Sequence, residues 1–111
     1  MDAELMAFTQ KYLNFSDLQN RLFHSYHVDY RQCEILRFVF KSCLKQQSIK
    51  ISDVLLLKEI ASQATIHKIV HELIKANLLK SEADPNDERV KYLTPTPATL
   101  GLFSELGKEL K

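Results

Sequence analysis

The sequence predicts a mainly α-helical domain that carries one small β hairpin. Apolar residues recur at steps of three and four along most of the chain, which is the period of a helix. The chain has only 2 glycines and 3 prolines, too few for the many turns of a β-sandwich. A single polar turn, residues 84–88, separates two short stretches that are typical of strands.

Length and composition favour one ordinary globular domain. The chain has 111 residues, of which 45% are hydrophobic and 26% charged, so one core is expected and disorder is not. No apolar run approaches the ~18 residues of a membrane span, and the N-terminus lacks the basic segment of a signal peptide. We therefore expect a cytoplasmic protein without membrane association. The net charge of +1 confines any nucleic-acid surface to a local patch.

The two cysteines, Cys33 and Cys43, fall within one predicted helix. A helix rises about 1.5 Å per residue, which places them roughly 15 Å apart, too far for a disulfide. We expect reduced thiols, as is usual in the cytoplasm. We expect both side chains to be small buried apolar groups, with a redox role as the alternative.

Residues 2–27 carry a helical stripe, with a break expected near residues 14–17. The apolar positions of the stripe are Leu5, Phe8, Tyr12, Phe15, Leu22 and Tyr26. A small domain offers such a helix little to pack on, so a partner subunit is its natural cover. A second helix begins at Asp29, where Asp29 and Gln32 resemble a capping box, and it ends near Lys45. Its stripe consists of Ile35, Leu36, Val39, Phe40, Cys43 and Leu44.

A short strand at residues 49–51 precedes two closely spaced helices. Ser52 is the expected N-cap of a helix over residues 53–60, with Asp53 favourable at its positive end. Ser62 is the expected N-cap of the next helix, which runs to Ala76. Asn77 stands where a left-handed residue usually ends a helix. Two helices joined by about three residues form a helix-turn-helix.

The hairpin and a last helix complete the chain. The flanks of the turn, residues 78–83 and 89–94, predict the two strands of a wing. Thr94 is the expected cap of the last helix, with Pro95 in its first turn. The apolar residues of this helix are Leu100, Phe103, Leu106 and Leu110. We expect residues 1–111 to form one domain, with an N-terminal helix over 1–28, a winged helix-turn-helix over 29–94 and a C-terminal helix over 95–111.

Residues 52–94 resemble the winged helix of MarR-type transcription regulators. The family pattern of a polar cap, a Thr, alternating apolar and basic residues, a stop and an apolar pair is matched from Ser62 to Leu79. The family's wing signature, two Asp residues followed by an Arg and a strand ending in Leu-Thr, is matched from Asp84 to Thr94. The chain departs from the family in its shorter length and in having Asn77 where Gly is usual.

The resemblance implies a sequence-specific regulator that binds double-stranded DNA as a homodimer. Because catalytic motifs are lacking, the chain is not expected to be an enzyme. Residues 2–27 and 98–110 are the expected dimer interface. A two-fold dimer favours a pseudo-palindromic site. The resemblance also implies an effector, whose identity the residues leave open. The alternative is a winged helix that contacts proteins and not DNA. Near-neutral charge and an acidic wing favour this second hypothesis.

The helix after Ser62 is the expected reader of the major groove. Its apolar residues Ile66, Ile69, Val70 and Leu73 should face the core, which leaves Gln63, Thr65, His67, Lys68, His71 and Lys75 outward. Gln63 suits a bidentate contact with adenine, Thr65 and Lys68 suit phosphate, and Lys68 also suits guanine. Ser62 and the helix N-terminus suit a phosphate. The alternative is a solvated polar face with no partner.

Arg89 and Lys91 are the expected wing contacts. By the resemblance, Arg89 contacts the minor groove or the backbone; a salt bridge to Asp84 or Asp87 is the other interpretation, and both can hold together. Over residues 62–80, three Lys against one Glu give +3 − 1 = +2. Over residues 81–91, two cations against four carboxylates give +2 − 4 = −2. DNA affinity should therefore be modest and salt-sensitive.

No cofactor, metal site or catalytic group is expected. His24 and His27 lie three positions apart near Asp29, but a closed zinc site needs four ligands at defined spacing. The sequence has no Gly-rich phosphate loop, no H-E-x-x-H pair and no nucleophile elbow.

Overall fold

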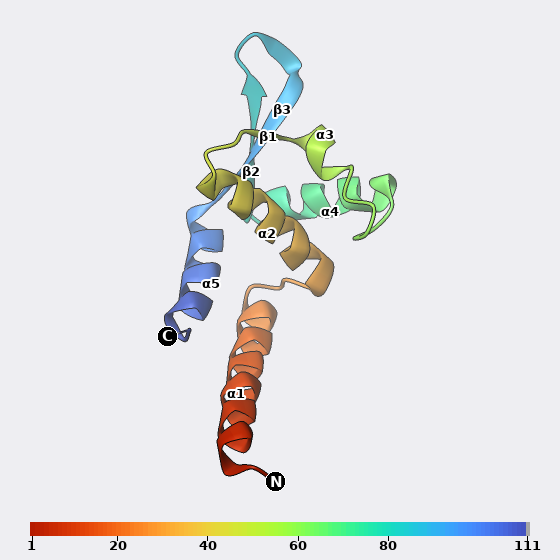
Figure 1. The fold of residues 1–111 in the computed structure, drawn as a ribbon. Helices are drawn as coiled ribbons and strands as arrows, with labels where there is room; N and C mark the ends of the chain where they lie inside the picture. The colour runs from red at the N-terminus through yellow and green to blue at the C-terminus, as the bar shows by residue number, and fades with distance from the viewer. Residues whose placement is uncertain (111) are drawn as a thin grey trace. The chain divides into compact units, whose positions relative to one another are not determined.

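The computed structural model describes residues 1–110, which form five helices and three strands (Figure 1). In chain order these are α1 (Ala3–Ser25), α2 (Tyr30–Leu44), β1 (Ile49–Lys50), α3 (Ile51–Val54), α4 (Gln63–Lys75), β2 (Leu79–Asp84), β3 (Asp87–Pro95) and α5 (Pro97–Lys108). The chain divides into two units: Met1–Asp29 with Gly101–Lys111, and Tyr30–Leu100.

The strands of the second unit form one antiparallel sheet in the order β1-β3-β2 (Figure 1). Leu79 lies opposite Pro95 and Asp84 lies opposite Asp87, so β2 and β3 form a hairpin closed by two residues. The short strand β1 pairs with the far side of β3, where Ile49 lies opposite Leu93. The predicted short strand and the predicted hairpin are both confirmed.

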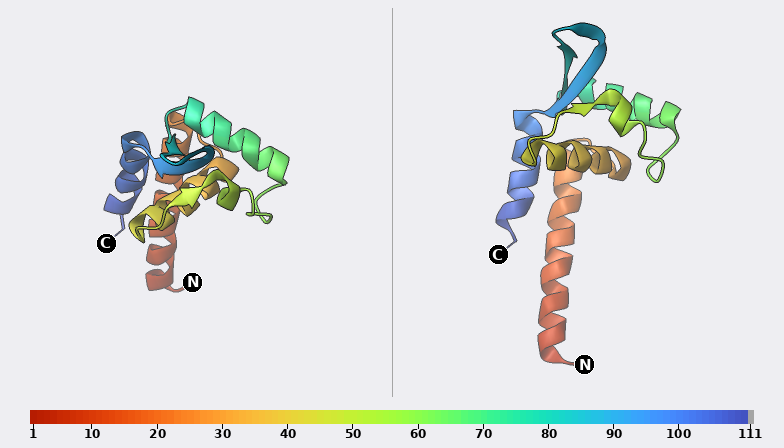
Figure 2. Two further views of the ribbon diagram at one scale, coloured as in Figure 1. Left: turned by 90° about the horizontal axis from the view of Figure 1, so that it is seen from above. Right: turned by 45° about the horizontal axis from the view of Figure 1, so that its top comes forward.

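Three helices cover the sheet and supply the core of the second unit. α2 contacts α4, α3, β1 and β3, and α4 also contacts β2 (Figure 2). The apolar side chains that are at most 3% exposed include Ile35, Leu36, Val39, Val54, Ile66, Val70, Leu73, Leu79 and Leu93. Because these side chains come from α2, α3, α4 and both hairpin strands, their burial fixes α4 and the hairpin in one body.

In the first unit, α1 is a single unbroken helix of 23 residues. The side chain of Asp2 accepts hydrogen bonds from the backbone N–H groups of Glu4 and Leu5, at 2.8 and 3.0 Å, and thereby caps the helix. The break expected near residues 14–17 is absent from the described chain, and the side chain of Asn14 accepts a hydrogen bond from Gln10 Nε2 one turn earlier at 2.8 Å. None of the residues of α1, all of which the structure describes, is buried.

Two predicted details of the second helix are wrong. Cys43 is exposed and so is Leu44, at 75%, whereas Cys33 is fully buried as expected. At the end of α2 the buried position is instead Ser42, whose hydroxyl donates to the carbonyl oxygen of Phe38 at 3.0 Å. The hydrogen bond lets a small polar residue face the core at little cost. Both cysteines are free thiols, as predicted.

The helices at residues 53–60 and 95–111 begin at positions other than the predicted ones. α3 starts at Ile51 and ends at Val54, with Lys50 and not Ser52 as its N-cap. Residues 55–62 therefore separate α3 from α4, and the predicted connection of about three residues is wrong. Asp53 reaches back to accept the backbone N–H of Lys50 at 2.9 Å, which fixes this earlier start. Thr94 and Pro95 remain in β3, so α5 begins at Pro97. The hydroxyl of Thr96 accepts the N–H of Thr99 at 3.4 Å.

The stripe expected on the last helix is shifted as well. Leu106 is buried as predicted, whereas Leu100 is 55% and Leu110 65% exposed. Leu102 is fully buried although it was not in the predicted stripe. Leu102 and Leu106 are four residues apart and therefore share one face of α5, whereas Leu110 lies beyond the end of the helix at Lys108.

Candidate nucleic-acid interface

α4 is amphipathic with one fully buried side. Ile66, Val70 and Leu73 are at most 1% exposed and Ile69 is 7% exposed, as the spacing predicted. Ser62 caps the helix: its hydroxyl oxygen accepts the N–H of Thr65 at 3.3 Å. The same hydroxyl donates to the hydroxyl oxygen of Thr65 at 3.0 Å. The predicted start of this helix is therefore confirmed.

The opposite side of α4 is polar and open to solvent. Its exposed members Gln63, His67, Lys68, His71 and Lys75 were all predicted to point outward, and the N-cap residue Ser62 is exposed as well. Thr65 differs because it is only half-exposed and is already engaged by Ser62. Two cations and two imidazoles thus share the exposed side of one helix. The carboxylate of Glu72 accepts from the amide nitrogen of Gln32 on α2, at 3.4 Å.

The two histidines of α4 lie against each other. His67 and His71 are one helical turn apart, and their ring centroids are 4.5 Å apart with the planes at 62°. This is an edge-to-face contact. The sequence placed both residues on the outer side of the helix without predicting this contact, although an i, i+4 spacing is its ordinary signal.

The end of α4 is fixed by a left-handed residue and two threonine hydrogen bonds. Asn77 has φ 61°, as its position predicted. The hydroxyl of Thr96 donates to the carbonyl oxygen of Asn77 at 2.7 Å, and that of Thr99, fully buried, donates to the carbonyl oxygen of Leu78. These bonds tie the segment between α4 and β2 to the first turn of α5. They fix the end of α4 relative to the start of β2.

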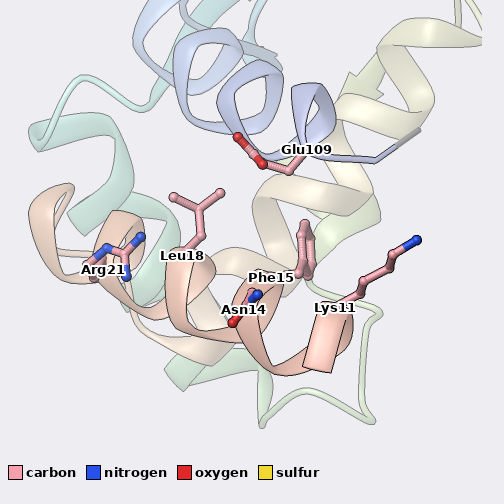
Figure 3. A pocket seen from close by; sticks show the side chains of 6 residues that line it. All are labelled: Lys11, Asn14, Phe15, Leu18, Arg21 and Glu109. Atoms are coloured by element: carbon pink, nitrogen blue, oxygen red, sulfur yellow. The ribbon is translucent and has the colours of Figure 1, made fainter. Parts of the chain in front are cut away.

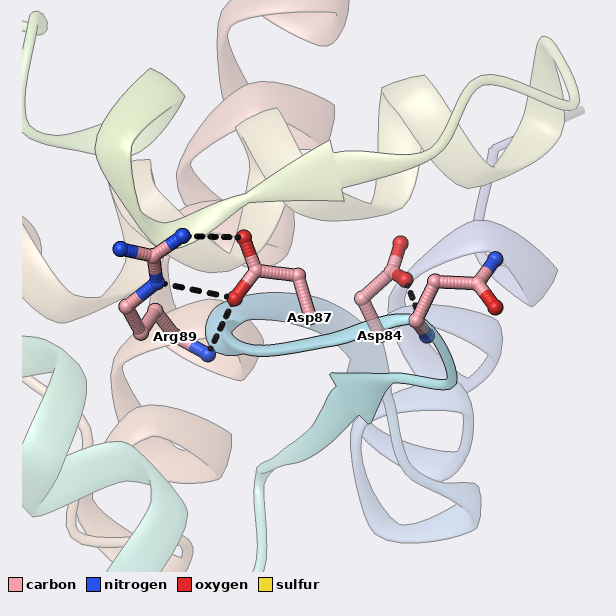
Figure 4. Close-up of polar contacts among 4 residues, drawn as sticks. Asp84, Asp87 and Arg89 are labelled. Carbon is pink, nitrogen blue, oxygen red and sulfur yellow. Dashed lines mark hydrogen bonds and ion pairs between the residues drawn. The ribbon is translucent and has the colours of Figure 1, made fainter.

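The tip of the hairpin is organised by two aspartates (Figure 4). Asp84 accepts the backbone N–H of Asn86 at 2.8 Å and the phenol O–H of Tyr92 at 2.9 Å. Asp87 accepts the backbone N–H of Arg89 and its guanidinium Nε–H, both at 3.0 Å, and the Nη2–H at 3.2 Å. Of the two interpretations of Arg89, the salt bridge is confirmed, with Asp87 as its partner.

These hydrogen bonds shift the proton affinities at the tip. The backbone N–H of Asn86, followed by the phenol of Tyr92, lowers the pKa of Asp84. The guanidinium of Arg89 lowers the pKa of Asp87. The same contact with Asp84 raises the pKa of Tyr92. The hydrogen bond from Tyr92 to Asp84 was not predicted. The bond from the N–H of Asn86 has an ordinary sequence signal, because an Asp side chain in a turn often accepts the backbone N–H two residues later.

Arg89 is both fixed and accessible. Its side chain is 91% exposed although it is bound by Asp87 on one edge. A guanidinium has five N–H donors, so an edge-on carboxylate leaves donors for a second anion. Lys91 is also exposed, and Lys80 pairs with Glu82 at 2.9 Å. The wing therefore presents one oriented cation within a region of net negative charge.

The first unit contains a pocket of about 500 Å³ that the sequence did not predict (Figure 3). Its lining is Lys11, Asn14, Phe15, Leu18, Arg21 and Glu109. Two cations flank an apolar floor, and the one carboxylate comes from the residue after α5. Such a lining suits an amphipathic anion by charge and by apolar contact.

The described residues contain neither a cluster of metal ligands nor a helix suited to a membrane. Within residues 1–110, no three side chains among His, Cys, Asp and Glu come together in a way that could hold a metal ion. In the same part of the chain, no helix combines the length and apolar character that a bilayer crossing requires.

Comparisons with known proteins identify the fold. No protein-family model and no curated protein matches the sequence. Among solved structures, the S. aureus MepR–DNA complex is 15% identical over 98% of this chain and 86% of that one, with a TM-score of 0.69. NadR in complex with 4-hydroxyphenylacetate is 18% identical over 98% and 74%, with a TM-score of 0.63. The transcriptional regulator Tm0710 from Thermotoga maritima is 13% identical over 94% and 70%, with a TM-score of 0.67.

These neighbours are MarR-family transcription regulators. At such identities the likeness is one of fold. The chain thus has the MarR-type winged-helix fold that the patterns of Ser62–Leu79 and Asp84–Thr94 predicted.

Proposed function

We propose that this chain is a sequence-specific transcription regulator of the MarR type that binds double-stranded DNA and has no enzymatic activity. α4 enters the major groove, where Gln63 contacts bases and Lys68 and Lys75 contact phosphates. Ser62 and Thr65 hold a phosphate at the start of the helix. His67 and His71 lie between these contacts, and Arg89 and Lys91 follow the backbone beside the groove.

One observation carries this proposal: α4 has a fully buried apolar side and an exposed side with two lysines, two histidines and a glutamine. A helix needs such an outward side to read base edges. The fold of the S. aureus MepR–DNA complex supports the same use of the helix here. The adjacent hairpin presents Arg89 at 91% side-chain exposure, which supports a second contact.

We further propose that the protein acts as a homodimer through residues 2–27 and 98–110. α1 exposes large apolar side chains, among them Leu5 at 63%, Phe8 at 54% and Tyr12 at 66%. An apolar surface of this kind on a soluble chain marks an association site. A two-fold dimer presents two copies of α4 to a pseudo-palindromic site.

Sedimentation of purified protein tests the dimer. Phe8→Asp should dissociate it, because a carboxylate would replace a ring within the apolar surface. Gln47→Asp adds the same charge at an exposed position outside both segments and should leave the dimer intact. A parent protein that sediments as a monomer contradicts the proposal.

The small-molecule effector and the cytoplasmic location belong to the same proposal. The pocket at Phe15 and Leu18, with Lys11 and Arg21 beside it, supports an effector with an apolar body and a negative charge. This part is tested by titrating the protein–DNA complex with a panel of aromatic carboxylates and measuring the release of a fluorescently labelled duplex. Release of DNA by one of them supports it, and no release by any member contradicts that ligand class.

A shift assay on random-sequence duplex DNA tests DNA binding itself. Affinity should be measurable at low salt and should fall steeply towards about 0.2 M, because each neutralised phosphate releases counterions. The second candidate function, contact with proteins and not DNA, is favoured by the net charge of −2 over residues 81–91. Absence of any shift at low salt would select that candidate.

A further inference from the structure

We propose that His67 and His71 form a binding site for one divalent transition-metal ion of the zinc, nickel or copper class on the exposed side of α4. The two residues are four positions apart, so both imidazoles leave the helix on one side, a turn apart. Two histidines at this spacing on a helix are a known way to hold zinc in proteins.

The distance between the rings fits a shared ion. Two imidazoles bound at ~2.1 Å from each nitrogen to one tetrahedral ion have ring centres roughly 5 Å apart. The observed centroid distance is 4.5 Å, with the planes inclined at 62° rather than stacked. Small rotations of two exposed side chains therefore suffice to converge two nitrogens on one ion, with no movement of the backbone.

The surroundings set the remaining ligands and the strength of the site. Within residues 1–110 no third His, Cys, Asp or Glu side chain joins the pair, so water completes the coordination shell. Lys68 follows His67 directly and Lys75 lies one turn beyond His71, and their charges oppose a cation. We therefore expect moderate affinity, with imidazole favouring transition metals over Mg²⁺ and Ca²⁺.

Binding can be tested on the full chain without DNA. An ion that binds only the folded chain raises its melting midpoint, by roughly 5 °C for a free concentration about five times the dissociation constant. We expect this rise with ZnCl₂ and its loss in H67A, in H71A and in the double variant. Ala favours helix at exposed positions, so these variants keep their fold. The double variant His24→Ala, His27→Ala removes two other histidines and should retain the rise.

Calorimetric titration with ZnCl₂ gives the stoichiometry. One ion per chain in the parent and none in the double variant at positions 67 and 71 is the expected result. Equal binding by the parent and that variant, as an ion on Cys43 would give, overturns the site. So does a parent protein whose midpoint does not respond to ZnCl₂.

The regulatory consequence rests on the proposed function. An ion on the two imidazoles occupies one ring nitrogen of each and adds bound water on the side of α4 that faces bases in the proposed function. The affinity for a selected duplex should therefore be roughly tenfold lower in ZnCl₂ than in EDTA, and DNA should lower the affinity for the ion by the same factor. The double variant at positions 67 and 71 should have the same DNA affinity in ZnCl₂ as in EDTA. Unchanged DNA affinity on loading would overturn this consequence; absence of DNA binding in EDTA would overturn the proposed function and leave the metal site standing.

Discussion

Arg89 and Asp87 form a two-point ion pair at the tip of the hairpin: Nε lies 3.0 Å from one carboxylate oxygen and Nη2 lies 3.2 Å from the other. The backbone N–H of Arg89 donates to the same carboxylate. A pair this exposed contributes little to stability, because solvent screens it. The pair instead orients the guanidinium of Arg89, whose remaining N–H groups are available to a second anion.

Replacing Arg89 should therefore affect DNA binding far more than folding. Arg89→Ala should weaken binding to every duplex roughly tenfold and lower the salt slope by about 1, because one phosphate contact is lost. The melting midpoint should change little. Fluorescence anisotropy with a labelled duplex at several salt concentrations gives both quantities. A variant that binds like the parent assigns Arg89 a purely structural role.

Acid should loosen the hairpin tip. The carboxyls of Asp84 and Asp87 both have lowered pKa values in the folded chain, through the N–H of Asn86 and the guanidinium of Arg89 respectively. Their stabilisation is therefore complete above the ordinary value of 3.8 and is lost as pH falls through the folded-state pKa.

Amide NMR spectra of the wing between pH 6 and about 2.5 measure this loss. The double variant Asp84→Asn, Asp87→Asn should show a smaller change over the same range. Glu88→Gln makes one such replacement on the same hairpin and should behave like the parent. A double variant with the parent's full acid response would contradict the assignment.

The buried hydroxyl of Thr99 should stabilise the end of α4. Thr99→Val keeps the shape but leaves the carbonyl oxygen of Leu78 without its donor, which should cost about 1–2 kcal/mol of unfolding free energy. Thr94→Val, at an exposed position of β3, should stay within about 0.5 kcal/mol of the parent. Urea unfolding followed by circular dichroism makes the comparison. Equal stability of the two variants would show that the Thr99 hydrogen bond contributes nothing.

Two non-glycine residues with positive φ should respond in opposite ways. Asn77 has φ 61° and Gln46 has φ 58°. Asn adopts this conformation at lower cost than Gln, so Gln46→Gly should raise the unfolding free energy by about 0.5–1 kcal/mol. Asn77→Ala should lower it by about 1 kcal/mol. Thermal melts should show a higher midpoint for Gln46→Gly and a lower midpoint for Asn77→Ala than for the parent. Destabilisation by Gln46→Gly would mean that its side chain contributes more than its backbone strain costs.

Gln63 should govern base preference. Gln63→Ala removes a side chain suited to adenine but no charge, so binding to random DNA should be kept while the preference among selected sequences relaxes by about 1–3 kcal/mol. Selection from a random pool with the parent and the variant compares the two. Identical selected sequences would remove Gln63 from the reading surface.

The fold was predictable where local chemistry and periodicity agree. Ser62, the apolar spacing of Ile66 to Leu73 and the stop at Asn77 specify α4 without reference to the rest of the chain. The Asp-rich turn specifies the hairpin in the same way. The start of α3 was not predictable, because Lys50 is no usual cap and only the returning side chain of Asp53 makes it one. The exposure of Cys43 depends on where α2 leaves the core, which spacing alone does not give.

The candidate site was predictable as a set of outward residues but not as contacts. The spacing gave Arg89 two possible carboxylates, and the local conformation of the hairpin tip places Asp87 against both the backbone N–H and the guanidinium of Arg89. The pocket at Phe15 and Leu18 joins residues of α1 with Glu109, far away in sequence. The edge-to-face contact of His67 with His71 depends on side-chain rotation, which no pattern of residues determines.

The central claim, that the exposed side of α4 contacts DNA, is tested most directly by the salt dependence of duplex binding for Lys68→Ala against Lys41→Ala, an equal charge change on the exposed surface of α2. We expect Lys68→Ala to lose about tenfold in affinity on every sequence and about 1 in salt slope, and Lys41→Ala to match the parent. Identical affinities and slopes for both variants would contradict the account.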